Sequence, residues 1–179
     1  NFNETTIEFR GSCKLQIRAY NEGIAYRIIS ALEGEITIKN EHAGFVCDEN
    51  SLLTFQYDMR ANSDYEAPYI RKKITEIQSG DKGNLPALLE LPSRKKILFL
   101  EAGVWDYPVM WISKNANHLQ ATFWPYPAKY YEKGNSMTFK KVIEHHDYLA
   151  KTEGTREFPW RIFALAGEDT ELLCNQLVY

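Results

Sequence analysis

Residues 13–30 read CKLQIRAYNEGIAYRIIS, and this stretch predicts the fold more clearly than any other part of the chain. Apolar and polar residues alternate from Cys13 to Tyr20, as they do in a strand that buries one face. Asn21–Gly23 follows as a short turn, and its glycine permits the positive φ that tight hairpins require. Ile24–Ser30 then returns as a further strand. Because Thr5–Arg10 also alternates with a period of two, we predict a three-stranded β-meander at the start of the chain.

Short strand-like runs separated by turn signals continue to the last residue. We predict further strands at Glu35–Lys39, Leu52–Tyr57, Ile70–Gln78, Leu85–Leu91, Ile97–Leu100, Leu119–Phe123, Thr138–Ile143 and Trp160–Ala166. We predict loops at Asn62–Tyr69, Ser79–Asn84 and Glu153–Pro159, and a single helical turn at Glu168–Leu173. The sequence contains no amphipathic helix of 12 residues or more. This pattern predicts an all-β fold, either a sandwich or a barrel.

Composition narrows the range of functions. The chain has 179 residues and a net charge of −3, and its longest basic clusters, Arg71–Lys73 and Arg94–Lys96, hold only three residues each. A nucleic-acid partner is therefore not expected. No apolar run reaches 18 residues, so no membrane span is expected. Cys13, Cys47 and Cys174 are odd in number and far apart, which favours buried free thiols over a disulfide framework.

The most unusual charge lies in residues 97–111, ILFLEAGVWDYPVMW, where Glu101 follows four large apolar residues. A carboxylate at the end of a buried strand requires a cation or hydrogen-bond donors. Glu101 is therefore either the start of a surface turn or one ligand of a site. Paired with Asp106 it would supply the two carboxylates of a glycoside hydrolase, but a sandwich of this length offers no deep cleft for them. We expect Asp106 to be a turn residue before Tyr107–Pro108.

Other candidate residues have simpler interpretations. Adjacent residues of a strand point to opposite faces, so His145 and His146 are expected at an exposed strand end and not at one metal ion. Glu41–His42 lies beside chain-breaking residues and is expected in a loop. Four aromatic residues are suited either to stacking on sugars or to packing in the core: Trp105, Trp111, Trp124 and Tyr126.

Four segments, in order, resemble glycoside hydrolase family 97. Arg18–Arg27 is similar to the family's "R-x-Y-N-D-G-V-A-Y/F-R" hairpin, and Glu101–Met110 to its "E-A-x-L-x-x-Y-P-G-M" segment. Phe158–Ile162 is similar to "T-P-W-R-V", and Leu177–Tyr179 to the start of "L-V-Y-N-L". The order and spacing of all four match, and together they cover most of the chain. Val109 departs from the pattern by replacing a glycine, which predicts a shifted loop or an altered specificity.

This resemblance implies that residues 1–179 form a single domain, a galactose-mutarotase-like β-super-sandwich that lacks its first strands. In the family this domain precedes a catalytic (β/α)8 barrel, which carries the acid and the base or nucleophile. Family members hydrolyse α-glucosides or α-galactosides, mostly in the bacterial periplasm. The partners implied are therefore the barrel and an α-linked oligosaccharide, in a periplasmic or secreted enzyme, and the isolated chain is expected to be inactive.

The resemblance also implies a cofactor. In the calcium-dependent members the sandwich lends one glutamate to the metal, and the matching position here is Glu101. Calcium takes six to eight oxygen ligands and one glutamate supplies at most two, so this chain alone would hold an incomplete site. The alternative is a freestanding β-sandwich that binds carbohydrate or another protein.

Overall fold

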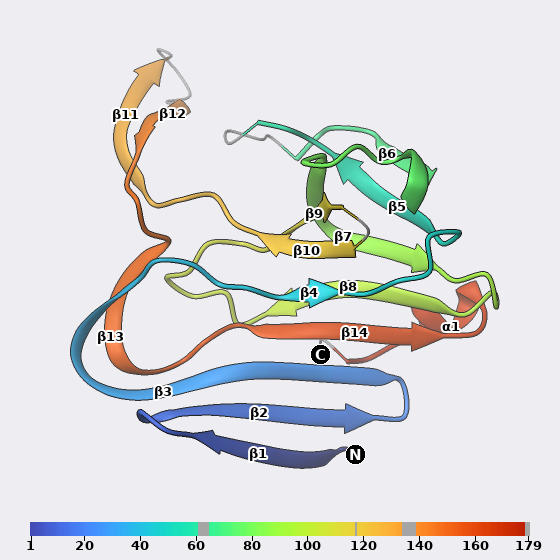
Figure 1. The fold of residues 1–179 in the computed structure, drawn as a ribbon, viewed down its shortest axis with the longest axis horizontal. Helices are drawn as coiled ribbons and strands as arrows, with labels where there is room; N and C mark the ends of the chain where they lie inside the picture. Colours follow the sequence, from blue (N-terminus) through green and yellow to red (C-terminus); the bar gives the residue numbers. More distant parts are fainter. Residues whose placement is uncertain (61–64, 117, 134–138, 178–179) are drawn as a thin grey trace.

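The computed structural model describes residues 1–60, 65–116, 118–133 and 139–177. These residues form an almost entirely β structure (Figure 1). The strands are β1 (Asn3–Phe9), β2 (Cys13–Tyr20), β3 (Gly23–Ile38), β4 (Gly44–Phe45), β5 (Leu52–Tyr57), β6 (Tyr69–Lys73), β7 (Lys82–Glu90), β8 (Lys96–Ala102), β9 (Trp111–Asn115), β10 (His118–Thr122), β11 (Pro127–Lys133), β12 (Phe139–His145), β13 (Ala150–Glu157) and β14 (Trp160–Ala166). A 3-10 helix spans Ile74–Glu76, and α1 spans Asp169–Leu173. The all-β fold is confirmed, as is the single helical turn near the end.

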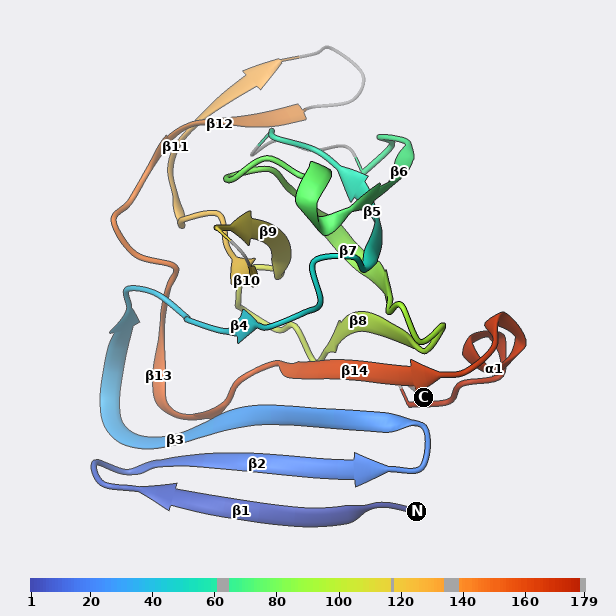
Figure 2. The same cartoon turned by 45° about the vertical axis from the view of Figure 1, so that its right-hand side comes forward.

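One large sheet runs through the molecule and curls back over itself. Its strand order is β1-β2-β3-β14-β8-β7-β9-β10-β4, so the last strand in this order, β4, is far from the meander along the sheet. Figures 1 and 2 show β4 lying over β8 and β14. Phe45 of β4 brings its ring centroid to 5.2 Å from that of Phe99 and 5.5 Å from that of Phe163. The β11–β12 hairpin forms a separate two-stranded sheet that stands away from the rest (Figure 2).

The main core lies inside this curl and not under the meander. Its members are Leu53, Phe55, Ile74, Ile77, Ala87, Leu89, Phe99, Met110, Ile112, Leu119 and Ala121. They come from β5, the 3-10 helix, β7 to β10 and the residues that directly adjoin these elements, Ile77 and Met110. Burial of their apolar surface is the main force that holds the curl closed.

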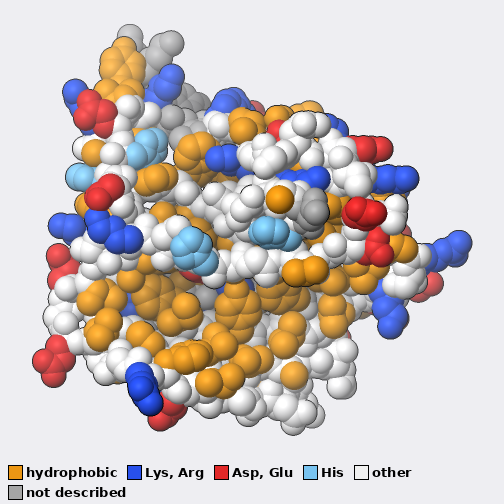
Figure 3. All heavy atoms as spheres, viewed as in Figure 1, with side chains coloured by type: hydrophobic (Ala, Val, Ile, Leu, Met, Phe, Trp, Pro, Cys, Tyr) orange, Lys and Arg blue, Asp and Glu red, His pale blue; other side chains and the backbone are white. Residues whose placement is uncertain are grey.

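The predicted meander is confirmed, with β1, β2 and β3 paired antiparallel in sequence. However, its apolar residues remain partly open to solvent, because no second layer covers them among the described residues. Ile28 keeps 41% of its surface exposed, and every residue of β1 is exposed. Figure 3 shows hydrophobic side chains gathered on this face, over the area that β3 and β14 occupy in Figure 1.

Two predicted boundaries around β3 were wrong. Ile24–Ser30 and Glu35–Lys39 are parts of one long strand, and Glu153–Pro159, predicted as a loop, largely belongs to β13. β13 reads AKTEGTRE and lacks apolar alternation, so the sequence carries no strand signal there. It forms because its backbone pairs with β3 along nearly its whole length. At Gly154 a Cβ would lie 2.5 Å from the carbonyl oxygen of Leu32, so the close approach of the two strands requires glycine.

Smaller corrections concern the region before β8. The second half of the predicted loop Ser79–Asn84 belongs to a strand, since β7 begins at Lys82. The predicted strand Ile70–Gln78 ends at Lys73 and turns into the 3-10 helix. Residues 62–64 of the predicted loop Asn62–Tyr69 and Thr138 of the predicted strand Thr138–Ile143 lie outside the described residues.

Two further predictions concern the state of the cysteines and the presence of a membrane span. All three cysteines are free, as predicted, but none is fully buried: Cys13 and Cys47 are half-buried and Cys174 is exposed. In the described part of the chain, no helix is both long and apolar enough to cross a membrane.

Candidate functional site

Glu101 lies near the end of β8, and its carboxylate is held from two directions. The loop after β8 returns so that the backbone N–H of Met110 donates to both oxygens, at 3.1 Å to Oε1 and 3.0 Å to Oε2. Across the sheet, Arg161 of β14 is its direct neighbour in the strand register. The Glu101 side chain keeps only 11% of its surface exposed. Glu101 is therefore not the start of a surface turn.

Arg161 joins Glu101 to a second carboxylate from a distant part of the chain. Its Nη1 donates to Glu101 Oε2 at 2.7 Å. Its Nε and Nη2 donate to the two oxygens of Glu41 at 2.8 and 2.7 Å. Glu41 belongs to the segment between β3 and β4. We call Glu41, Arg161 and Glu101 the Arg161 triad.

The Arg161 triad carries two negative charges and one positive charge in a largely buried place. Burial raises the pKa of Glu101, and the nearby Glu41 adds to this, while the Met110 N–H and the charge of Arg161 oppose it. Burial also disfavours the charged form of Arg161, but the hydrogen bonds and charge of Glu41 outweigh it and the pKa of Arg161 is raised. A net negative charge with little access to water favours the approach of a cation.

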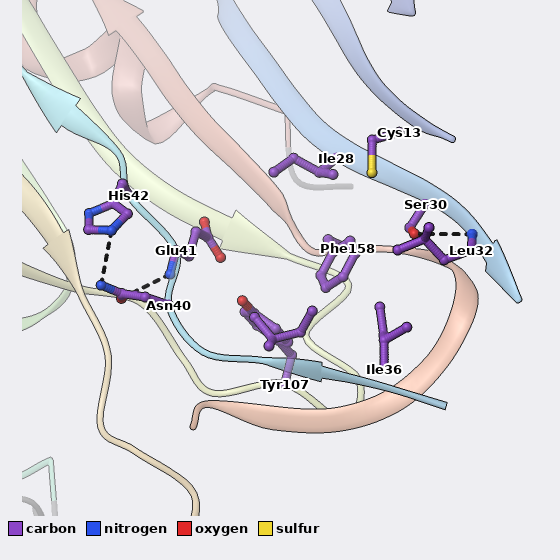
Figure 4. A pocket seen from close by; sticks show the side chains of 11 residues that line it. Cys13, Ile28, Ser30, Leu32, Ile36, Asn40, Glu41, His42, Tyr107 and Phe158 are labelled. Atoms are coloured by element: carbon purple, nitrogen blue, oxygen red, sulfur yellow. Dashed lines mark hydrogen bonds between the residues drawn. The ribbon is translucent and has the colours of Figure 1, made fainter. Parts of the chain in front are cut away.

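An open pocket of about 260 Å³ adjoins the triad (Figure 4). Its walls are mainly apolar and come from the start of β2, the later part of β3 and the segment before β14: Cys13, Ile28, Leu32, Ile36, Ile38 and Phe158. Its polar end holds Glu41, His42 and Tyr107. In Figure 4 the Tyr107 hydroxyl and the Glu41 carboxylate point toward each other. Burial, followed by the charge of Glu41, raises the pKa of Tyr107 well above its usual range.

The geometry permits Glu101 to supply one metal ligand but does not build a metal site. Among its described contacts, Oε1 accepts only the Met110 N–H, so it keeps room for a further partner. Within residues 1–60, 65–116, 118–133 and 139–177, no three His, Cys, Asp or Glu side chains are grouped so that they could hold an ion. These residues fit one carboxylate of a shared calcium site and not a complete site.

The other sequence candidates lie outside this network. Asp106 sits in the bend after β8 with φ +54°, which confirms it as a turn residue. His145 and His146 are exposed at the end of β12, as predicted, and stack on Trp124 and Tyr148 respectively.

The aromatic candidates divide into core and surface residues. Trp111 is 1% exposed and packs its edge against Trp124 at 5.7 Å, so it belongs to the interior. Trp124 is further covered by Lys82, whose Nζ lies 4.5 Å from the ring centroid. Trp105 is 78% exposed and Tyr126 is 49% exposed, so only these two present open surface.

Sequence reasoning missed two members of the triad. Glu41 was interpreted as a loop residue, and Arg161 as one position of a buried strand. Arg161 itself was the signal in the sequence that could have indicated this network, because a charged residue within an apolar strand needs a buried counter-charge.

The chain matches known proteins over its full length. The family described as Glycosyl-hydrolase 97 N-terminal matches residues 1–179. A retaining alpha-galactosidase of Bacteroides thetaiotaomicron is 26% identical over 190 residues, which cover 100% of this chain and 29% of that protein. The chain therefore spans less than a third of the curated relative that it matches.

Solved structures share the fold at lower identity. A variant of a Glycoside Hydrolase Family 97 enzyme from Pseudoalteromonas sp. strain K8 superposes with a TM-score of 0.71 at 15% identity, over 97% of this chain and 28% of that one. The enzyme from the same strain in complex with acarbose gives a TM-score of 0.69 at 14% identity, with the same coverage. The crystal structure of a beta-arabinopyranosidase gives a TM-score of 0.62 at 16% identity, over 92% of this chain and 27% of that one.

Proposed function

The chain belongs to the glycosyl-hydrolase 97 N-terminal family, and from this premise we propose that it is the accessory domain of a larger glycoside hydrolase. In this proposal it docks on the catalytic barrel and lends Glu101 to a calcium site next to the bound sugar. The observation that carries the proposal is the arrangement of Glu101: a mostly buried carboxylate, oriented by Met110 and Arg161, with one oxygen that accepts a single hydrogen bond.

The open apolar surface supports docking on another part of the same enzyme. Ile24, Ile28 and Leu32 are exposed on β3, and Ile28 and Leu32 also line the pocket beside Glu41. Contiguous apolar surface of this kind marks an interaction site on a folded protein. Because the chain spans only 29% of its curated relative, a covering domain within the same polypeptide is the simplest partner.

The activity proposed for the parent enzyme is hydrolysis of an α-linked oligosaccharide. The name of the curated relative supports this substrate class, and the resemblance supports a periplasmic or secreted location, which cell fractionation tests. The acid and the base or nucleophile would come from the barrel, and the isolated chain is expected to have no activity. Calcium, when bound, would act as a Lewis acid on a sugar oxygen. The contribution of this chain is to hold the carboxylate of Glu101 in a fixed position for the metal.

The test uses the full-length enzyme and Glu101→Gln. This change keeps the shape of the side chain and removes its charge, so we expect calcium affinity, measured by calorimetry, and turnover at limiting calcium both to fall. Glu90→Gln is the matched control, because Glu90 forms an exposed ion pair with Arg71 on the same domain. Unchanged calcium affinity and kinetics in Glu101→Gln would remove Glu101 from the site.

A second candidate function rests on the exposure of Trp105. A tryptophan that is 78% exposed offers an open face for a sugar ring, as a freestanding carbohydrate-binding domain requires. Calorimetry of the isolated chain with α-linked oligosaccharides tests this. Binding that Trp105→Ala abolishes would favour this second function, and no heat at millimolar sugar would exclude it.

A further inference from the structure

We propose that Glu41 and Arg161 are positioning residues, which together hold Glu101 in the orientation that presents Oε1, the oxygen that Arg161 does not bind, to a cation. This inference rests on the proposed function and adds two residues to it. Neither residue is expected to touch the metal or the substrate. Both act through Glu101, and their effect is on its geometry and on how strongly it attracts a positive charge.

The roles of the two glutamates differ because Arg161 binds them differently. Both oxygens of Glu41 accept hydrogen bonds from Arg161, in a bidentate pair at 2.8 and 2.7 Å. Only Oε2 of Glu101 is bound by Arg161, at 2.7 Å. A bidentate pair fixes the plane of the guanidinium as well as its position. Glu41 is thus the anchor, and Glu101 is the carboxylate that keeps an oxygen for another partner.

Aromatic rings hold the guanidinium from its faces. The Cζ atom of Arg161 lies 5.1 Å from the ring centroid of Phe123 and 5.9 Å from that of Tyr107. With its edges bound to carboxylates and its faces against rings, Arg161 has little freedom to move. Because Arg161 is held in place, it also holds Glu101 in place through its hydrogen bond to Oε2, which accepts a second hydrogen bond from the Met110 N–H.

Glu41 also decides whether Arg161 helps or hinders a cation. A guanidinium 2.7 Å from Glu101 would by itself repel an approaching positive charge. Glu41 supplies the second negative charge, so that the Arg161 triad remains net negative. Removing the charge of Glu41 leaves Arg161 paired with Glu101 alone, and a cation would then have to compete with Arg161 for that carboxylate.

The experiment measures calcium binding to the full-length enzyme in two variants. Glu41→Gln keeps the shape of the Glu41 side chain and removes its charge. Arg161→Lys keeps the positive charge and loses the bidentate hydrogen bonding to Glu41. We expect each to weaken calcium binding by about 10- to 100-fold, the usual effect of losing a group that orients a metal ligand. We further expect excess calcium to restore much of the lost turnover, because the ligand itself is still present.

Folding is measured on the same samples by thermal unfolding, with Glu90→Gln as control. If the triad were only structural, both variants would unfold at lower temperature while the folded fraction bound calcium as tightly as the unaltered enzyme, and this result would overturn the inference. If Glu101→Gln weakens binding but Glu41→Gln and Arg161→Lys do not, the positioning role is wrong and the proposed function stands. If Glu101→Gln itself binds calcium normally, the proposed function is wrong.

Discussion

Arg161 of β14 and Glu101 of β8 face each other across neighbouring strands, with Arg161 Nη1 2.7 Å from Glu101 Oε2. The register of the sheet places them in contact, and Glu41 reaches the same guanidinium from a segment 120 residues away. The network therefore links β8, β14 and the segment before β4, and it lies at the boundary between the closed core and the open apolar face.

Removal of Arg161 is expected to destabilise the fold strongly. Arg161→Met keeps an apolar stem but leaves Glu41 and Glu101 buried close together without a counter-charge. Breaking a buried pair from one side lowers the free energy of unfolding by about 3–5 kcal/mol. Chemical denaturation measures this change. Arg71→Met, which breaks an exposed pair with Glu90, is the control and should lower it by less than about 1 kcal/mol. Equal small effects in both variants would show that the triad does not stabilise the fold.

Glu101 is expected to make stability depend on pH in a specific direction. Burial raises its pKa in the folded chain above the ordinary value of 4.5, so the folded state binds this proton more tightly than the unfolded state does. Its contribution to stability is therefore fully present below about pH 4.5 and declines as pH rises through the folded pKa.

The measurement is the free energy of unfolding of the unaltered chain minus that of Glu101→Gln, followed as a function of pH. Groups that do not interact with Glu101 cancel in this difference. A difference that falls with increasing pH agrees with the burial of Glu101. One that rises with pH would mean that Arg161 and Met110 outweigh burial and lower the pKa of Glu101.

Gly83 is expected to be intolerant of any side chain. A Cβ at this position in β7 would lie 2.3 Å from the carbonyl oxygen of Gln56 and 2.4 Å from Phe55 Cδ2. Gly83→Ala should therefore lower the unfolding free energy by about 1–3 kcal/mol, because strand and core must both shift. Gly44→Ala is the control, since the nearest atom to its Cβ would be 4.0 Å away. Similar unfolding temperatures for the two variants would contradict the tight packing of β5 against β7.

The sequence predicted those strands whose signal is local. The second and third strands of the meander were found because their alternation and the turn at Asn21–Gly23 lie close together within residues 13–30. β13 was not found, because its polar residues form a strand only when β3 provides a partner. The position of the core was also beyond local reasoning, since Phe45 meets Phe163 only after the sheet has curled.

Only the part of the candidate site that has a local signal in the sequence was predicted. Glu101 was found because a charge directly after an apolar run is visible in the sequence. Glu41 was not found, because nothing near it in the chain indicates a partner 120 residues away. Trp111 was a candidate for binding sugars that the structure excludes. Exposed and buried tryptophans cannot be distinguished in the sequence, and the fold shows that Trp111 is only 1% exposed.

The most direct test of the central claim is calorimetry of calcium with residues 1–179 alone and with the full-length enzyme, after a cooperative unfolding transition has shown that both are folded. A domain that lends one glutamate to a shared site should give little heat by itself, while the full-length enzyme binds calcium and loses affinity in Glu101→Gln. Micromolar calcium binding by residues 1–179 alone would contradict this account.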